Sequence, residues 1–590
     1  MADDAGSAFT SFATATLDGL LDRQPEWATG VGDHRYDDRL TVGTAAYYEQ
    51  TSRWADERLA ALSGIDTGRL SPQLQVDAQI LANQLTRLRF MIDELGEHEW
   101  NPMVANPGRA IYDLLARDFA PRADRLRSAA RRLAMLPESL AAARSVLGPM
   151  PEIHIETALT QFAGTERLLT GELRRAAGGV PGAARDLDEV LPGALEAIAE
   201  HTRWLEERLA SGRRDGFRDP RLGADLFARK LTLVLDTELP VEQIVARAEA
   251  DLAQAGEELA AAAAEYTGTA RRAASPGAAA SGAAGTGPGG PGAGPGGPGA
   301  DPGGRDPVRA VLDALAADAP DDATILGFVR DAFVAQRQFV KARDLVTVFD
   351  DPLEVIAMPE IDRGVAVAYC DSPGPLETAA LATFIAVSPT PEDWAPDRVR
   401  SFYREYNRHM VHNLMVHEAM PGHALQLQHS HRFAGATKVR AAWRSGSFVE
   451  GWAVYAEQVM GAHGYPGEGN PVAVRTQRLK SKLRVIINAI MDARAHCDGM
   501  TQEQAMALMT GPGYQEEGEA AGKWRRVLLT SAQLSTYFVG FTEVSGLAAD
   551  LQRAHPGWPE RELHDAMLAH GSPPARHLRT LLGVQPVAQG

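Results

Sequence analysis

Apolar residues recur at steps of three and four positions through most of this chain, and this periodicity limits its possible folds more than any other feature. The pattern is clearest in residues 125–147, where Pro137 marks a boundary or a kink, and it returns in residues 72–95, 187–209 and 241–266. Such spacing places apolar side chains on one face of a helix. Alanine, leucine, arginine and glutamate dominate these segments and favour helix. We therefore expect a mainly α protein.

A different pattern occupies residues 344–389. Four runs that are β-branched or alternate in polarity, LVTVF, LEVIAM, GVAVAY and ATFIAVS, are separated by proline and glycine, which is typical of short strands. We expect a small β-sheet there, beside the helices that follow it. An edge strand next to a catalytic cleft is a common way to hold an extended peptide, although the sequence singles out no strand for this role.

Residues 268–305 are dominated by glycine, proline and alanine. A segment without hydrophobic periodicity buries too little surface to offset the entropy of ordering it, so we predict a disordered insertion. A plain surface loop is favoured here over a tether that binds a partner. The insertion divides the chain into an N-terminal helical region, residues 1–267, and a catalytic region, residues 306–590. The length of 590 residues itself suggests several domains.

The net charge of -18 and the pI near 5.4 disfavour binding to nucleic acid and to anionic membranes. No stretch reaches about 18 apolar residues without a charge, and the N-terminus lacks the basic and apolar regions of a signal peptide. The only cysteines are Cys370 and Cys497, which excludes a disulfide framework and a cysteine-ligated zinc cluster. We expect a cytoplasmic protein without nucleic-acid or membrane partners.

The chemistry concentrates in HEAMPGHALQLQ, residues 417–428. Neutral imidazoles are good zinc ligands, and a glutamate beside the first histidine is well placed as a general base. His417 and His423 are therefore candidate metal ligands, with Glu418 as the base. The preceding segment, YREYNRHMVHNLMV, has helical spacing and would present His417 on a packed helix.

The spacing of these histidines is unusual. They are six positions apart, whereas the common metalloprotease motif HExxH places them one helical turn apart. On a straight helix six residues rotate by roughly 240° and rise by about 9 Å, so His417 and His423 would not share a metal ion. Pro421 and Gly422 resolve the conflict, because proline interrupts a helix and glycine accepts unusual dihedrals. The metal hypothesis therefore requires the chain to reverse here.

A third ligand is expected, because a catalytic zinc site uses three protein ligands and leaves one position open. The segment SFVEGWAVYAEQVM offers Glu450, 27 residues after His423. Glu457 lies seven residues further along, on the same helical face two turns away. At that position Glu457 would orient a ligand histidine through a hydrogen bond.

Several neighbouring residues have plainer interpretations. Asp492 and His496 stand one turn apart, where they either line the cleft, hold a ligand in orientation or form an exposed pair. Arg525 and Arg526 either clamp a substrate carboxylate or face solvent. A helix pair without metal is the alternative to the zinc site. Four further histidines fit ordinary core or surface positions: His409, His412, His429 and His431.

The two motif segments together resemble the bacterial family called domain of unknown function 885, or DUF885. The stretches HEAMPGHALQ and FVEGWAVYAEQ carry this resemblance. Similar blocks occur at residues 32–40, 489–509, 533–540 and 563–574, so one DUF885-like unit spans about residues 5–585. The family is similar to the gluzincin metallopeptidases, near thimet oligopeptidase and neurolysin.

The resemblance implies a large helical metallopeptidase-like body with a deep cleft and one zinc ion at its floor. The metal ligands that it implies are His417, His423 and Glu450. It implies Glu418 as general base. In the thimet-like relatives C-terminal tyrosine hydroxyls stabilise the oxyanion, which points to Tyr537, with His570 as an assisting group. A packed core tyrosine and a helix-end histidine are the plainer interpretations. The two extra residues in HExxPGH depart from the gluzincin pattern.

Three functions follow from this site. The first is a zinc metallopeptidase that acts on short peptides, because a deep helical cleft would exclude folded proteins. The second is a zinc amidohydrolase that acts on a small non-peptide amide. The third is a catalytically inactive helical binding protein, against which the intact Glu418 argues. The sequence leaves open the substrate, exo- versus endo-cleavage and the oligomeric state, and it favours zinc over other metals only by ligand type.

Overall fold

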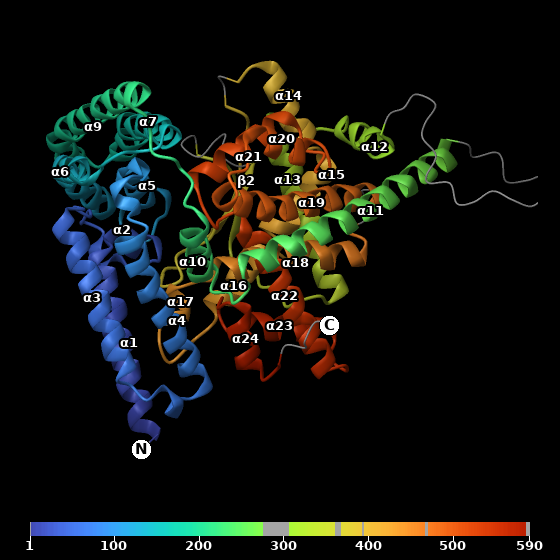
Figure 1. Cartoon of the computed structure of the whole chain (residues 1–590), viewed down its shortest axis with the longest axis horizontal. Helices are drawn as coiled ribbons and strands as arrows, with labels where there is room; N and C mark the ends of the chain where they lie inside the picture. The colour runs from blue at the N-terminus through green and yellow to red at the C-terminus, as the bar shows by residue number, and fades with distance from the viewer. Residues whose placement is uncertain (1, 275–305, 360–366, 392–393, 467–469, 586–590) are drawn as a thin grey trace, which may run out of the picture.

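The computed structural model describes residues 2–274, 306–359, 367–391, 394–466 and 470–585 (Figure 1). Within these ranges the chain is mainly helical with one small sheet, so the predicted fold class is confirmed. Most of the predicted insertion lies outside the described residues. Helix α11 continues through Ala274, into the first residues of that segment, and the insertion itself stays a prediction.

The helices of the first half, blue to green in Figure 1, are α1 (Ala2–Arg23), α2 (Pro25–Gly30), α3 (Ala45–Ser63), α4 (Pro72–Arg89), α5 (Gly108–Ala116), α6 (Arg122–Val146), α7 (Glu152–Arg167), α8 (Arg174–Ala177), α9 (Pro181–Asp215), α10 (Ala224–Leu235) and α11 (Val241–Ala274). Single turns of 3-10 or π helix stand at His34–Tyr36, Thr67–Arg69, Phe90–Glu94, Glu97–Glu99, Pro102–Ala105 and Leu168–Leu173.

The helices of the second half are α12 (Pro307–Ala316), α13 (Ile325–Arg343), α14 (Pro396–Glu405), α15 (Arg408–Glu418), α16 (His423–His431), α17 (Val439–Ala442), α18 (Gly446–His463), α19 (Pro471–Cys497), α20 (Gln502–Thr510), α21 (Glu517–Leu529), α22 (Ser535–Ala554), α23 (Glu560–Leu568) and α24 (Ala575–Leu582). None of the helices in the described part of the chain combines the length and the apolar character that a membrane span requires.

Helix α6 illustrates how the apolar spacing selects helix. Leu126, Leu133, Leu136 and Leu140 all lie in one buried cluster, which α6 shares with α7 and α9. Pro137 lies inside this helix and does not end it. The leucines on both sides of the proline keep the flanking turns in the core, and this packing outweighs the hydrogen bond that proline removes. Of the two interpretations of Pro137, the boundary is therefore wrong.

The sheet has three strands, β1 (Leu353–Ala357), β2 (Ala368–Asp371) and β3 (Thr383–Val387), in the order β1-β3-β2. Strand β1 is parallel to β3, and β2 is antiparallel to it, with Cys370 opposite Ile385. Helix α15 packs against β2. One edge of the sheet, formed by β2, therefore lies beside the helix that ends in His417 and Glu418.

One of the four predicted strands is not a strand. The run LVTVF follows α13 as irregular chain. Its backbone is bonded by side chains of other elements: the N–H of Thr347 donates to Asp565 at 2.9 Å, and its carbonyl lies 2.8 Å from Nε2 of His429. Leu345 and Val346 are buried in the main core. The apolar character of the run therefore serves helix packing and not sheet pairing.

The core does not divide at the predicted insertion. One buried cluster contains Leu231 and Ile244 from the first region together with Val308, Leu483 and Phe538 from the second. Helix α11 lies along α19, as Figure 1 also shows. The division into residues 1–267 and 306–590 stays a prediction, but the two parts share this apolar interior.

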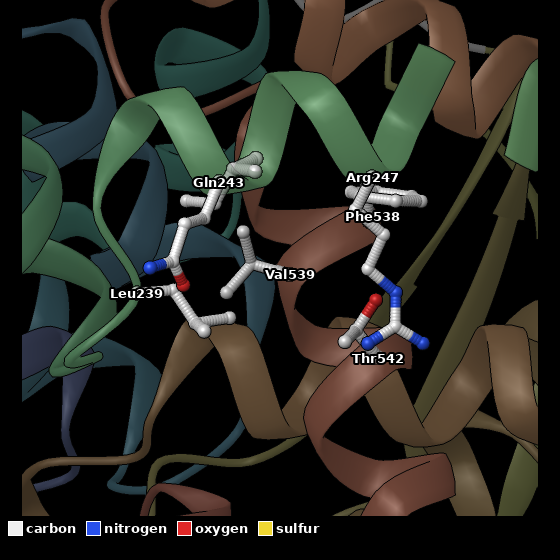
Figure 2. Close-up of a pocket in the computed structure, with 7 residues that line it drawn as sticks. Leu239, Gln243, Arg247, Phe538, Val539 and Thr542 are labelled. Atoms are coloured by element: carbon white, nitrogen blue, oxygen red, sulfur yellow. The ribbon is translucent and has the colours of Figure 1, made fainter. Parts of the chain in front are cut away.

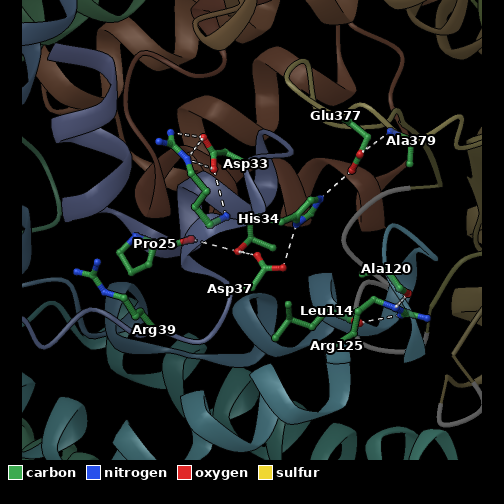
Figure 3. Close-up of polar contacts among 12 residues, drawn as sticks. Pro25, Asp33, His34, Asp37, Arg39, Leu114, Ala120, Arg125, Glu377 and Ala379 are labelled. Carbon is green, nitrogen blue, oxygen red and sulfur yellow. Dashed lines mark hydrogen bonds and ion pairs between the residues drawn. The ribbon is translucent and has the colours of Figure 1, made fainter. Parts of the chain in front are cut away.

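A histidine-centred contact joins the N-terminal helices to the sheet loops. His34 lies between two carboxylates, with Nδ1 3.0 Å from Asp37 and Nε2 2.8 Å from Glu377 (Figure 3). Its ring stacks on Phe119. Burial opposes protonation, but the two carboxylates outweigh it and raise the pKa of His34 above its usual value. The block at residues 32–40 thus fastens the chain to the segment between β2 and β3.

A second link is fully buried. Asp77 on α4 accepts hydrogen bonds from Nε of Arg440 at 2.6 Å and from the hydroxyl of Thr437 at 2.7 Å. Only 1% of either charged side chain is exposed. Removing one partner of such a pair leaves an uncompensated charge in a medium of low dielectric constant. This pair therefore holds α4 against α17, close to the start of α18.

We predict that Asp77→Ala lowers the free energy of unfolding by about 3–5 kcal/mol, because Arg440 would be left buried without a counter-charge. The matched control is Asp351→Ala, which breaks the exposed pair with Arg432 and should cost less than about 1 kcal/mol. Urea denaturation followed by circular dichroism measures both. Equal losses for the two variants would contradict the assigned role of the buried pair.

We also predict a pH-dependent contribution from His34. Because the folded state raises its pKa, protonated His34 stabilises the fold fully below about pH 6.5, and this stabilisation is lost as the pH rises through the raised value. His34→Gln should therefore cost more stability at pH 5.5 than at pH 8.5. Urea unfolding at both pH values tests this, and Glu377→Gln should reduce the same pH dependence. A cost that does not change with pH would refute the prediction.

Candidate metal centre

The segment between α15 and α16 makes the chain reversal that the metal hypothesis requires. Helix α15 ends at Glu418, and α16 begins at His423. The N–H of Gly422 donates to the carbonyl of Val416 at 2.9 Å, so the chain folds back onto the last turn of α15. A Cβ at position 422 would overlap the carbonyl oxygens of Val416 and His417. Only glycine fits this contact.

The reversal places the imidazole rings of His417 and His423 next to each other. The rings of His417 and His423 have centroids 4.7 Å apart and planes at 85°. The turn itself is fixed from α18, because the indole N–H of Trp452 donates to the carbonyl of Pro421 at 2.8 Å. Trp452 is buried. Two side chains that would diverge on a straight helix are thus held face to edge.

Helix α18 brings a carboxylate to the same point. Oε2 of Glu450 lies 3.3 Å from Nε2 of His417 and 3.4 Å from Nε2 of His423. One ligand atom from each residue lies within 4.8 Å of the others. The structure therefore brings together the three residues that the sequence suggests as metal ligands.

These distances fit a divalent ion. Tetrahedral ligands at about 2.0–2.1 Å from zinc are about 3.3 Å from one another, close to the two separations measured from Glu450. Oε2 of Glu450 is buried and has no hydrogen bond within the described residues, which is costly unless another partner binds it. Two imidazole nitrogens and a carboxylate are also the donor types that zinc prefers. The residues present fit the ion.

A buried hydrogen-bond chain orients the first histidine. Nδ1 of His417 lies 2.9 Å from Oε1 of Glu457, and Oε2 of Glu457 accepts from the amide of Asn413 at 2.6 Å. The hydroxyl of Tyr465 donates to Asn413 at 3.2 Å. Glu457 thus has the orienting contact that its spacing predicts, and it leaves Nε2 of His417 directed at Glu450. Nδ1 of His423 has no such partner among the described residues.

The three candidate ligands lie in an electrostatic environment that attracts positive charge. Burial opposes protonation of His417, but Glu450 and Glu457 together raise its pKa well above the usual value. For Glu450, burial opposes ionisation, yet His423 and His417 lower its pKa. The carboxylate therefore stays ionised and complements positive charge at the point where the three side chains meet.

Glu418 adjoins this point from the end of α15. Its carboxylate is buried, and the backbone N–H of Cys370 on β2 lies close enough to lower its pKa. Burial raises the pKa of Glu418, while His423 and His417 oppose the rise. A carboxyl group that is poised above its usual pKa both accepts and returns a proton more readily near neutral pH.

Tyr537 reaches the site because α22 crosses α18 in backbone contact. A Cβ on Gly451 would overlap the backbone of Gly540, and one on Gly540 would overlap the carbonyl of Ser447. Gly451 directly follows Glu450 in the sequence. Gly540 lies about one turn after Tyr537. The crossing therefore brings the phenol towards the ligand carboxylate.

The phenol interacts with the charges of the site. Burial raises the pKa of Tyr537, and the negative charge of Glu450 raises it further. Arg526, from α21, points Nη2 at the phenol oxygen at a distance of 3.5 Å. A neutral hydroxyl near a guanidinium and within the electrostatic reach of the candidate ligands is a suitable hydrogen-bond donor for a developing oxyanion. Arg525 instead faces α7, where it bonds Thr157 at 2.8 Å.

The other predicted residues lie elsewhere. His570 follows the end of α23, where the charge that acts on it is that of Arg440, and no described contact joins it to the three candidate ligands. Four further histidines have ordinary surroundings. His429 and His431 lie against backbone carbonyls of Thr347 and Pro373, His409 lies near Asp318, and His412 packs edge-on against Phe328.

Asp492 and His496 are buried, so the exposed pair is the wrong interpretation. Asp492 accepts from the N–H and the hydroxyl of Ser535, both at 2.8 Å. Nε2 of His496 lies within 3.0 Å of the carbonyls of Val527 and Thr530. The pair therefore fixes the segment that joins α21, which carries Arg526, to α22, which carries Tyr537, and does not hold a metal ligand.

Sequence reasoning missed part of the site. Asn413 stands four residues before His417, one turn away on the same helical face, and this spacing was the available signal. Tyr465, the Cys370 N–H and the close crossing at Gly451 and Gly540 depend on contacts between distant segments. No pattern within one segment of the sequence predicts such contacts.

A shallow pocket of about 180 Å³ lies between the start of α11 and α22 (Figure 2), where Gln243 and Arg247 face Val539 and Thr542. Its lining includes none of the metal-centre residues. It uses a different face of α22 from the one that carries Tyr537. The deep cleft implied by the family resemblance therefore stays a prediction.

The comparisons with known proteins agree with this architecture. A family model described as bacterial protein of unknown function, DUF885, matches residues 25–582. The chain belongs to the DUF885 family. The predicted membership is thereby confirmed, while the relation to gluzincins stays a prediction. A search of curated proteins gives no match for this DUF885 protein.

Two solved structures are similar over nearly the whole chain. One is described as a presumed lipoprotein of unknown function from Shewanella oneidensis, with 27% identity and a TM-score of 0.78, covering 97% of this chain and 99% of the other. The second is a presumed lipoprotein from Colwellia psychrerythraea, with 16% identity and a TM-score of 0.72, covering 99% and 98%. The second likeness is one of fold.

We predict that Gly422→Ala destabilises the DUF885 protein by about 3 kcal/mol or more, because the new methyl group would meet backbone that has no room to move. The control is Gly522→Ala on α21, where a Cβ meets nothing within 4 Å; this change should stabilise helix by about 0.5–1 kcal/mol. Urea unfolding measures both. A Gly422→Ala variant as stable as the parent would disprove the tight reversal.

Proposed function

We propose that this DUF885 protein is a zinc-dependent peptidase that hydrolyses peptide bonds in short peptides. The observation that carries the proposal is the convergence of His417, His423 and Glu450 at separations suited to one tetrahedral ion, with Glu418 beside them. Structural zinc sites are closed by four protein ligands, whereas three ligands leave a position for water and substrate. The ligand set therefore supports catalysis over a purely structural role.

The chain's own residues supply the proton transfers. When bound, zinc supplies the Lewis acidity that activates a water and polarises a carbonyl. Glu418 takes the proton of the attacking water and returns it to the leaving amine. The hydroxyl of Tyr537 donates a hydrogen bond to the oxyanion. Nη2 of Arg526 lies 3.5 Å from this hydroxyl and donates towards it. Glu457 keeps the ring of His417 in its ligating orientation.

A distant relation to the gluzincins is part of the proposal. The two extra residues of HExxPGH are accommodated by the reversal between α15 and α16, and Glu450 stands on a following helix in the manner of the FVE-type segment. Ligand identity and order thus agree with that superfamily even though the histidine spacing differs.

The edge of the sheet supports a peptide over a small amide. The pairing of β2 with β3 leaves the N–H of Cys370 on the outer side of β2, where it lowers the pKa of Glu418. Strand β2 is thus an edge strand whose outward backbone groups line the approach to Glu418. An extended peptide would add to this edge through main-chain hydrogen bonds. A small non-peptide amide has no comparable use for a strand edge.

The remaining expectations follow from the sequence and stay predictions: a cytoplasmic location and no nucleic-acid or membrane partner. The description of the Shewanella protein as a presumed lipoprotein refers to that protein. Fractionation of native cells decides the location of this one. The small-amide hydrolase and the inactive binding protein are the outcomes against which the peptidase is tested.

We predict about one zinc ion per purified chain, loss of the metal in His423→Ala, and retention of the metal in Glu418→Gln with kcat lowered by about 10²–10⁴-fold. Metal analysis and product mapping on a pool of short peptides, with and without chelator, measure these effects. His412→Gln, which alters a histidine packed on Phe328, is the control and should keep both metal and activity.

Three results would contradict the proposal. Zinc far below one per chain would favour the inactive binding protein. Full activity in a metal-loaded Glu418→Gln variant would remove Glu418 as the base. Cleavage of acylated small amines without cleavage of any peptide would assign the site to an amidohydrolase.

A further inference from the structure

Arg444 is held rigidly in the loop between α17 and α18, on the approach to the metal-centre helix. Trp443 before it stacks on Trp27, with ring centroids 5.6 Å apart. Ser445 after it donates its N–H to the carbonyl of Ser572 at 2.7 Å, and its hydroxyl caps α18 by accepting from the N–H of Phe448. Both neighbours of Arg444 are thus fixed, and its side chain is not part of a loose surface loop.

Two nitrogens of the Arg444 guanidinium are buried without a partner. Its Nε and Nη2 atoms are both inaccessible to solvent, and neither donates a hydrogen bond to any described residue. No other arginine in the described ranges has two such nitrogens. The other deeply buried arginines have acceptors: Arg440 is paired with Asp77, Arg484 with Glu405, and Arg132 donates to the hydroxyl of Thr29 and to three carbonyls.

Such a group carries a large energetic cost. A charged donor that is buried without an acceptor loses its hydrogen bonds to water and gains none within the protein. Burial lowers the pKa of Arg444 to about 10, and no carboxylate of the described chain offsets this effect. The residue as a whole is only half-buried, so the rest of its side chain is open to solvent. The Arg444 guanidinium therefore has the features of a group that binds an anion.

The position of Arg444 relates this group to the proposed catalytic residues. Its charge acts on the thiol of Cys370, and the thiol is also within reach of the charge of Glu418. The backbone N–H of Cys370 lowers the pKa of Glu418 and therefore lies near that carboxylate. Arg444 therefore lies near β2, the strand that packs against α15 of the metal centre. The neighbouring Arg117 is already paired with Asp371 at 3.1 Å, which leaves Arg444 as the available cation there.

We propose that Arg444 binds a carboxylate of the substrate and so restricts the enzyme to peptides with a free carboxylate near the scissile bond. This inference rests on the proposed peptidase function and specifies its substrate class. The planar guanidinium offers parallel pairs of N–H donors that match a carboxylate. Nε and Nη2, which have no acceptor among the described residues, form one such pair once the side chain turns towards the solvent that it already partly contacts. The carboxylate belongs either to the peptide C-terminus or to an acidic side chain.

The kinetic experiment compares three matched sets of short peptides on the zinc-loaded protein: neutral peptides with a free C-terminus, the same peptides with a C-terminal amide, and amidated peptides that contain Asp or Glu. We expect kcat/KM to favour one carboxylate-bearing set by about 10- to 100-fold. Preference for the first set identifies the terminal carboxylate, and preference for the third identifies an acidic side chain. Arg444→Met should abolish the preference, and Arg444→Lys should restore part of it.

The stability of the Arg444→Met variant distinguishes a binding role of Arg444 from a structural role. Because Arg444 has no partner to lose, Arg444→Met should unfold at the same urea concentration as the parent or a higher one. The control is Arg525→Met, which removes an exposed arginine and should leave the substrate preference unchanged. Equal kcat/KM for all three peptide sets, or a preference that survives in Arg444→Met, would overturn the proposal.

A binding experiment tests the carboxylate site independently of the peptidase activity. Trialanine and its C-terminal amide are titrated calorimetrically into the zinc-loaded Glu418→Gln variant, together with an amidated peptide that contains Glu. If no peptide is cleaved by the parent protein, tighter binding of a carboxylate-bearing peptide that Arg444→Met weakens still supports the carboxylate site. Identical affinities for all three ligands would reject it, whatever the catalytic result.

Discussion

The contact between Gly422 and the last turn of α15 is the constraint on which the site depends. A helix that continued from His417 would carry His423 to another face, and Glu450 would then meet one imidazole instead of two. The reversal is fixed by the absence of a Cβ at Gly422 and by the bond from Trp452 to the carbonyl of Pro421. Because Trp452 stands two residues after Glu450, the helix that supplies the carboxylate also holds the turn that aligns the histidines.

Much of this arrangement could be predicted from residue types and spacing. The histidine pair, Glu450 and the orienting role of Glu457 follow from donor chemistry and helical periodicity. The need for a reversal at Pro421 and Gly422 follows from helix geometry alone. These inferences succeed because each concerns residues within one or two consecutive helices, where the sequence interval fixes the relative position.

The rest could not be predicted, because it depends on contacts between distant segments. The run at Leu345–Phe349 has strand-like residues, yet side chains from α16 and α23 bond its backbone. Asp492 and His496 have the spacing of a surface pair, but α19 is buried along that face. Arg444 sits in no motif, and only its lack of a neighbour distinguishes it. Periodicity predicts which face of a helix is apolar, and it does not predict what will cover that face.

The crossing of α18 and α22 has a consequence for how this scaffold can diversify. Where two backbones touch at Gly451 and Gly540, the gap between the ligand carboxylate and the phenol of Tyr537 is set by main-chain dimensions. Repacking of side chains will not widen it. Variation in the size of bound ligands among homologues should therefore arise in the loop before α18 and along β2, while the spacing between Glu450 and Tyr537 stays constant.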